Sequence, residues 1–96
     1  MKRAVVVLAL LLVQLGSLPI VFGGGATMEK YSRVEPGMTY DQVVKILGSP
    51  DQELSRSEMA GITTVMYMWN GTSVGGNMNA MFQNGKLVNK AQFGLK

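Results

Sequence analysis

The sequence predicts an α+β two-layer sandwich, in which two short N-terminal helices pack on a three- to four-stranded antiparallel sheet. Three observations lead to this fold class. A capped amphipathic segment lies at residues 39–48, a run dense in β-branched and aromatic residues lies at 62–69, and Asn84-Gly85 separates two apolar stretches. These signals are typical of a short helix, a central strand and a β-hairpin. We expect a single such domain over residues 27–96.

Residues 1–26 have the layout of a secretory signal peptide, because two basic residues precede an apolar run and small residues follow it. We predict cleavage after Ala26, with a cut a few residues earlier as the alternative. A retained transmembrane anchor is the rival interpretation. Gln14, Gly16 and Pro19 interrupt the apolar run well before the roughly 20 residues that a membrane span needs. The mature protein is therefore expected to be exported, either periplasmic or secreted.

Two helices are expected before the sheet. The first is a short helical turn over residues 27–34. In the second, Thr39 is the N-cap and Gln42 completes a capping box, while Gly48 and then Pro50 end the helix. A helix of about two to three turns is not stable alone, so its apolar stripe must dock on the strands. The stripe consists of Tyr40, Val43, Val44 and Leu47.

The strands are expected after the second helix. Residues 51–57 are polar and predict a weak edge strand, joined through a connection at 58–61 to a central strand at Ile62–Trp69. Both faces of this central strand are apolar enough to be buried. One face carries Ile62, Thr64, Met66 and Met68, and the other carries Thr63, Val65, Tyr67 and Trp69.

Residues 76–83 and 86–93 are expected to form a hairpin around Asn84-Gly85, and two registers are open. A two-residue turn pairs Gln83 with Lys86 and places Phe82 and Leu87 on one face. A three-residue turn with a bulge pairs Gln83 with Leu87. It places Phe82 and Val88 on one face of the hairpin, and Met81, Leu87, Ala91 and Phe93 on the other. A slip of one residue moves every side chain to the opposite face, so the register decides which face is buried.

Composition argues against several classes of function. The chain contains neither Cys nor His, which removes disulfides, thiolate metal sites and the commonest general base. Without Lys2 and Arg3 of the predicted leader, the net charge falls from +3 to +1, which leaves no basic patch for a nucleic acid. The acidic residues lie on polar stretches, and no paired carboxylates suggest catalysis. We therefore expect no enzymatic activity, no small-molecule substrate and no cofactor.

Seven methionines from Met28 onward raise the question of a thioether site for a soft metal. No cluster of methionines with histidine support is present in the sequence. Methionine also fills irregular gaps in small cores and softens binding surfaces. We therefore predict no metal site.

The stretch VEPGMTYDQVVKILGSP, the aromatic end of the central strand and FQNGKLV resemble one superfamily. The shared elements are Gly37-Met38-Thr39, Gln42-Val43 and Leu47-Gly48. This superfamily includes the outer-membrane assembly lipoproteins of the SmpA/OmlA/BamE type and the repeat of the β-lactamase inhibitory proteins (BLIP). The assembly lipoproteins carry a lipidated Cys, and the inhibitors carry two repeats with a disulfide in each. This chain has no Cys and one repeat, so it is most similar to the single-domain secreted members.

The resemblance implies an exported protein-binding module that uses the sheet face turned away from the helices. Mapped by position, it places Val65, Tyr67 and Trp69 on that face, beside Asn79, Met81, Ala91 and Phe93. In the other arrangement, Tyr67 and Trp69 fill the core and the methionines of the strand face solvent. We predict the first arrangement, with an unidentified protein as the partner bound by Val65, Tyr67, Trp69, Asn79, Met81 and Phe93. The alternative function is a structural envelope component that supports outer-membrane integrity and is retained by its N-terminal segment.

Overall fold

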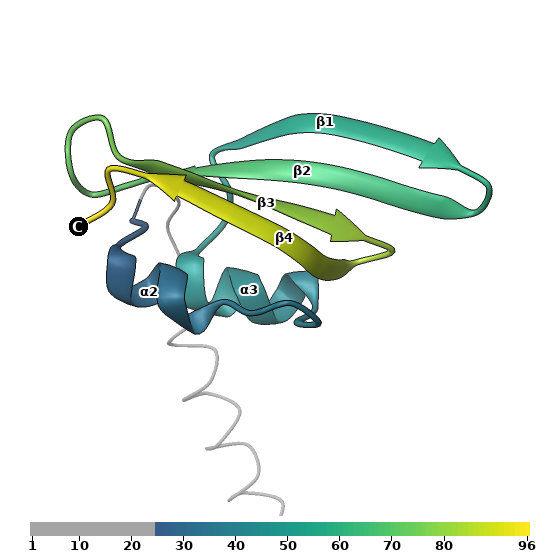
Figure 1. Cartoon of the computed structure of the whole chain (residues 1–96), viewed down its shortest axis with the longest axis horizontal. Helices are drawn as coiled ribbons and strands as arrows, with labels where there is room; N and C mark the ends of the chain where they lie inside the picture. The colour runs from purple at the N-terminus through teal and green to yellow at the C-terminus, as the bar shows by residue number, and fades with distance from the viewer. Residues whose placement is uncertain (1–24) are drawn as a thin grey trace, which may run out of the picture.

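The computed structural model describes residues 25–96, which form two short helices on one side of a four-stranded antiparallel sheet (Figure 1). This arrangement confirms the predicted fold class. The predicted signal peptide lies outside the described residues, apart from its last two positions. No helix among residues 25–96 is long and apolar enough to cross a membrane.

Ala26, at the end of the predicted leader, packs as part of the domain. Its side chain is fully buried, and its backbone forms a parallel bridge to Gly71. The Ala26 N–H donates to the Asn70 carbonyl at 3.2 Å, and the Ala26 carbonyl accepts from the Thr72 N–H at 3.1 Å. A chain that began at Thr27 would lose both hydrogen bonds.

Helix α2 spans Met28–Arg33 and helix α3 spans Tyr40–Leu47. The predicted capping box of α3 is present: the Thr39 hydroxyl accepts from the Gln42 N–H at 3.2 Å, and the Gln42 side chain accepts from the Thr39 N–H at 2.9 Å. Gly48 ends α3 with φ 86° and ψ 179°. Its φ is positive, as its position after the helix suggested, but its ψ is extended rather than left-handed helical.

The sheet has the order β1-β2-β3-β4. The strands are β1 (Gln52–Met59), β2 (Ile62–Asn70), β3 (Asn77–Gln83) and β4 (Lys86–Phe93). The connection before β2 is a two-residue turn, in which Ala60 and Gly61 both have positive φ. Ala-Gly is a poorer signal for this turn than Asn-Gly, so a tight hairpin between β1 and β2 was not predictable from the sequence. This hairpin extends beyond the end of the β3–β4 hairpin (Figure 1).

The β3–β4 hairpin combines features of both predicted registers. Asn84-Gly85 forms a two-residue turn that pairs Gln83 with Lys86 and Phe82 with Leu87. A bulge at Val88 then shifts the register, so that Met81 pairs with Asn89. As a result, Leu87 lies in the core, Val88 is exposed, and the rest of β4 follows the alternation that the bulged register predicted.

The segment before α3 joins the helical layer to the start of β4. The Gly37 N–H donates to the Leu87 carbonyl at 2.8 Å, and the Leu87 N–H donates to the Met38 carbonyl at 2.8 Å. Thr39 and Lys86 form an antiparallel bridge. At the other end of the helical layer, the Lys90 ammonium donates to the Tyr31 carbonyl at 2.7 Å and lies over the Tyr31 ring. These contacts fix both helices against β4.

The hydrophobic core lies between the helices and one face of the sheet. Val43 and Leu47 contribute from α3, together with half-buried Tyr40 and Ile46, whereas Val44 of the predicted stripe is outside the core. The buried members of the core are Ala26, Val34, Val43, Leu47, Trp69, Met78, Ala80, Phe82, Leu87 and Leu95.

Candidate functional site

The face of the sheet that no helix of residues 25–96 covers, which we call the open face, is the candidate binding site (Figure 1). The register places Val65 opposite Phe82, Tyr67 opposite Ala80 and Trp69 opposite Met78. Since Phe82, Ala80 and Met78 are core residues, the side of β2 that carries Trp69 faces the helices. Side chains alternate along a strand, so Thr64, Met66 and Met68 lie on the open face.

The predicted orientation of Val65, Tyr67 and Trp69 is therefore wrong. Trp69 is completely buried, and its indole N–H donates to the Gly48 carbonyl at 2.8 Å, at the end of α3. Val65 is 7% exposed, and Tyr67 is half-buried against the core. The largest apolar side chains gain most from burial, and the indole N–H finds a partner on the helix side.

The other three predicted residues, Asn79, Met81 and Phe93, do lie on the open face. Asn79 pairs with Met68 and with Ala91, and Met81 pairs directly with Met66. Phe93 pairs with Asn77 at the end of β4 and is 74% exposed. The prediction therefore placed β3 and residues 89–93 of β4 correctly, placed Leu87 on the wrong face, and reversed β2 relative to them.

Thioethers, amides and hydroxyls make up most of the open face. Met66, Met68 and Met81 are half-buried at its centre, on adjacent strands. The residues of the open face, from the strand registers, are Gln52, Ser55, Ser57, Met59, Ile62, Thr64, Met66, Met68, Asn70, Asn77, Asn79, Met81, Gln83, Lys86, Asn89, Ala91 and Phe93.

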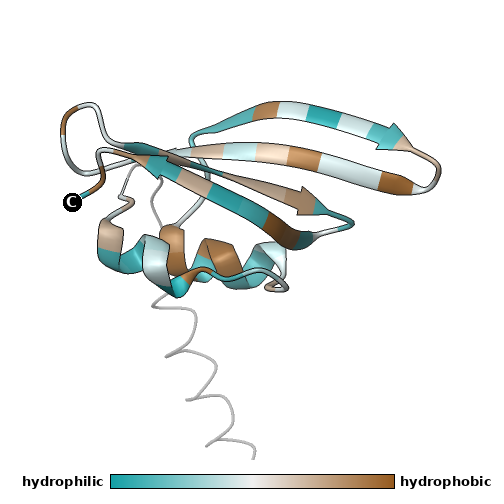
Figure 2. Cartoon of the chain, viewed as in Figure 1, coloured by the Kyte–Doolittle hydropathy of each residue, from teal (hydrophilic) through white to brown (hydrophobic). Residues whose placement is uncertain are grey.

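Charge is distributed unequally between the two faces of the sheet. Glu53, Arg56 and Glu58 of β1 pair with Tyr67, Val65 and Thr63, which places them on the helix side. Lys90 of β4 pairs with Ala80 on the same side. Among the charged residues of β1 to β4, the strands described within residues 25–96, Lys86 beside the hairpin turn is the one on the open face. β1 is thus mostly hydrophilic, whereas β2 carries hydrophobic bands along its length (Figure 2).

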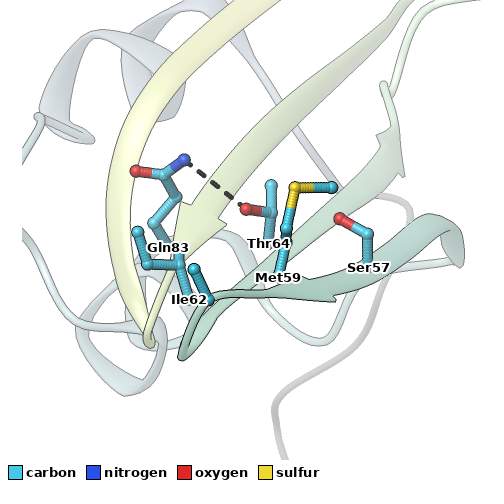
Figure 3. Close-up of a pocket in the computed structure, with 6 residues that line it drawn as sticks. Ser57, Met59, Ile62, Thr64 and Gln83 are labelled. Carbon is cyan, nitrogen blue, oxygen red and sulfur yellow. Dashed lines mark hydrogen bonds between the residues drawn. The ribbon is translucent and has the colours of Figure 1, made fainter.

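A shallow pocket of about 340 Å³ lies on the open face where the β1–β2 hairpin extends beyond β3 (Figure 3). Met59 and Ile62 give it apolar walls, and the Gln83 amide donates to the Thr64 hydroxyl at 3.4 Å across its side. The pocket is at the lower end of the sizes that hold small molecules. Its lining residues are Ser57, Met59, Ala60, Ile62, Thr64 and Gln83.

The outer edge of β1 is unsuited to pairing with another strand. All eight of its residues are exposed, but a bulge between Glu53 and Ser55 breaks the regular ladder. The bulge also allows Arg56 to form a bidentate pair with Glu53, at 2.9 and 3.0 Å. Bulges and charges are common ways in which natural proteins protect sheet edges. The face of the sheet is therefore a better candidate for binding than its β1 edge.

On the helix side, aromatic rings link α3 to the sheet. The Tyr40 ring lies 5.0 Å from the Tyr67 ring and 5.6 Å from the Phe82 ring. Burial raises the pKa of Tyr40 above its ordinary value, and the neighbouring Tyr67, Asp41 and Glu53 add to the effect. The hydrogen bonds from Arg56 lower the pKa of Glu53. Tyr40 and Glu53 therefore take part in contacts that hold the fold together. Within residues 25–96, no group of three or more acidic residues could hold a metal ion.

We expect the raised pKa of Tyr40 to make the protein sensitive to alkali. A tyrosine whose pKa is higher in the folded state stabilises the fold below its unfolded pKa of about 10, and the stabilisation is lost as pH rises through the folded pKa. Tyr40→Phe should therefore reduce the fall in the free energy of unfolding as pH rises above about 10. Urea unfolding at intervals of pH measures this. An unchanged fall in the variant would show that Tyr40 is not responsible.

The fold and the site together define a small α+β domain with one uncovered, almost uncharged sheet face. Residues 27–96 match the family model described as "Beta-lactamase inhibitor (BLIP)". The chain therefore belongs to the β-lactamase inhibitor (BLIP) family. This finding supports the inhibitor part of the resemblance, and the likeness to the assembly lipoproteins stays a prediction.

A solved structure supports the same relationship. The chain is similar to a candidate β-lactamase inhibitor protein from Streptococcus mutans, with 26% sequence identity and a TM-score of 0.66. The similarity covers 78% of this chain and 48% of the other, so this chain spans about half the length of that protein. No curated protein matches the sequence.

Proposed function

We propose that this protein binds another protein through the open face and acts as an inhibitor rather than as an enzyme, with a β-lactamase as the first partner to test. Membership of the β-lactamase inhibitor family is the observation that carries the proposal. The open face supports it, because Met66, Met68 and Met81 at its centre are adaptable contact residues. Phe93 adds an exposed aromatic ring, a residue type that often anchors interfaces.

Export to the periplasm or to the medium is part of this proposal, because a β-lactamase partner would be found there. The alternative function, a structural envelope component, depends on retention by residues that lie outside the described part of the chain. No contact within residues 25–96 favours it over protein binding.

The proposal is tested by adding the purified protein to a panel of β-lactamases and measuring nitrocefin hydrolysis. Thr64→Lys and Thr63→Lys form a matched pair, because the two residues are adjacent in β2, are both half-buried and point to opposite faces. We expect wild type and Thr63→Lys to inhibit at least one enzyme, and Thr64→Lys to inhibit about tenfold more weakly, because a lysine desolvated in an interface is costly.

The absence of inhibition and of binding across the panel would refute the β-lactamase proposal. Equal inhibition by the two lysine variants would refute the open face as the contact surface. Circular dichroism spectra of both variants serve as the folding control.

A further inference from the structure

The distribution of charge on the sheet limits the chemistry of the partner. Of the charged residues within the four strands, Lys86 lies on the open face, at its corner beside the Asn84-Gly85 turn. The central positions are occupied by Met66 and Met81, which pair directly, and by Met68 and Asn79, which pair beside them. None of these side chains can neutralise a charge on a docked surface.

The following inference rests on the proposed function. We propose that the part of the partner protein's surface that covers the open face is uncharged at its centre. A carboxylate or ammonium group placed against Met66 and Met81 would lose its water without gaining an ion pair, which disfavours binding. An uncharged patch of apolar and amide groups loses little water and gains contact with the thioethers and hydrogen bonds with Asn79.

The pocket at the end of the β1–β2 hairpin fits the same kind of partner. Met59 and Ile62 offer apolar contacts to one inserted side chain, and the hydroxyl and amide of Thr64 and Gln83 can hydrogen-bond a backbone group beside it. Glu58, between Ser57 and Met59 in β1, points to the helix side of the sheet, and the residues that line the pocket carry no charge. The pocket therefore accepts an aliphatic or aromatic side chain in preference to a charged one.

Charged variants of Met81 test this inference, because an uncharged and a charged partner surface would respond differently to lysine and to glutamate at this position. With an uncharged partner, Met81→Lys and Met81→Glu should both weaken binding by about tenfold or more, while Met81→Leu should stay within about threefold of wild type. Binding should also change less than about threefold when salt is raised from about 50 to about 500 mM. The affinities are measured by calorimetry or surface plasmon resonance with a β-lactamase that the inhibition panel identifies.

Two results would overturn the inference while the proposed function stood. One is opposite effects of lysine and glutamate at position 81, with one charge strengthening binding. The other is a loss of binding of tenfold or more in high salt, since either result requires a charged partner surface.

If no β-lactamase binds, the proposed function fails and the open face is tested with a phenyl matrix as the probe. We then expect Met81→Lys and Met81→Glu to be retained less than wild type, and Thr63→Lys, on the opposite face, to be retained like wild type. Equal retention of all four proteins would refute the open face as an uncharged contact surface.

Discussion

Replacing Trp69 with alanine should destroy most of the stability of the domain. The indole is completely buried between the helices and the sheet, and it contributes the hydrogen bond that joins β2 to the end of α3. Truncation of a buried aromatic residue to alanine typically costs about 3–5 kcal/mol. The whole stability of a domain of this size is about 4–10 kcal/mol. We expect Trp69→Ala to be largely unfolded at 37 °C, as measured by circular dichroism and thermal unfolding.

Two further variants separate the causes of this loss. Trp69→Phe keeps most of the buried area but leaves the Gly48 carbonyl without its donor, so it should cost about 1–3 kcal/mol. Phe93→Ala removes an aromatic ring from the open face, where it is 74% exposed, and should change stability by less than about 0.5 kcal/mol. If Trp69→Ala and Phe93→Ala were equally stable, the assignment of the two faces of the sheet would be incorrect.

Local signals made the helices predictable from the sequence. A capping box depends on two residues three positions apart, and Thr39 and Gln42 form it as predicted. Thr27 likewise caps α2 by accepting from the Lys30 N–H at 3.2 Å. The Asn84-Gly85 turn was predictable for the same reason, because the residue types that accept positive φ are few.

The buried face of β2 was not predictable from the strand itself, because both faces are apolar. The choice depends on which side pairs with Ala80 and Phe82, and this is a long-range property of the sheet. Position-by-position mapping from the resembled family favoured the wrong side. Burial of the larger side chains, Tyr67 and Trp69, was the physical criterion that pointed to the observed one.

Bulges limited how much of the site could be read from the sequence. The bulge at Leu54 places Glu53 and Arg56 on the same side of β1, although their spacing of three predicts opposite faces in a regular strand. The bulge at Val88 likewise shifts the alternation of β4, so that Lys90 lies on the helix side of the sheet. The uncharged character of the open face appears only when both bulges are known, because they decide which side the charges of β1 and β4 occupy.

The adjacent residues Gly75 and Gly76 should differ sharply in their tolerance of alanine. A Cβ atom at Gly76 would lie 2.8 Å from the Gly94 carbonyl oxygen and 2.7 Å from the Ser73 hydroxyl. It would therefore disrupt the hydrogen bond that the Ser73 hydroxyl donates to Gly94. We expect Gly76→Ala to cost about 2–4 kcal/mol, from overpacking against backbone and from the lost hydrogen bond.

Gly75→Ala is the matched control, because a Cβ atom there meets nothing within 4 Å and the cost comes only from the positive φ of 80°. This cost should be about 1 kcal/mol. Urea unfolding of the two variants gives the comparison. Gly76→Ala should also release Leu95 from the core, because Gly94 precedes it directly, and faster amide exchange at Leu95 would report this. Equal costs at the two positions would mean that the C-terminal segment moves freely away from the β2–β3 loop, and Leu95 would then contribute little to the core.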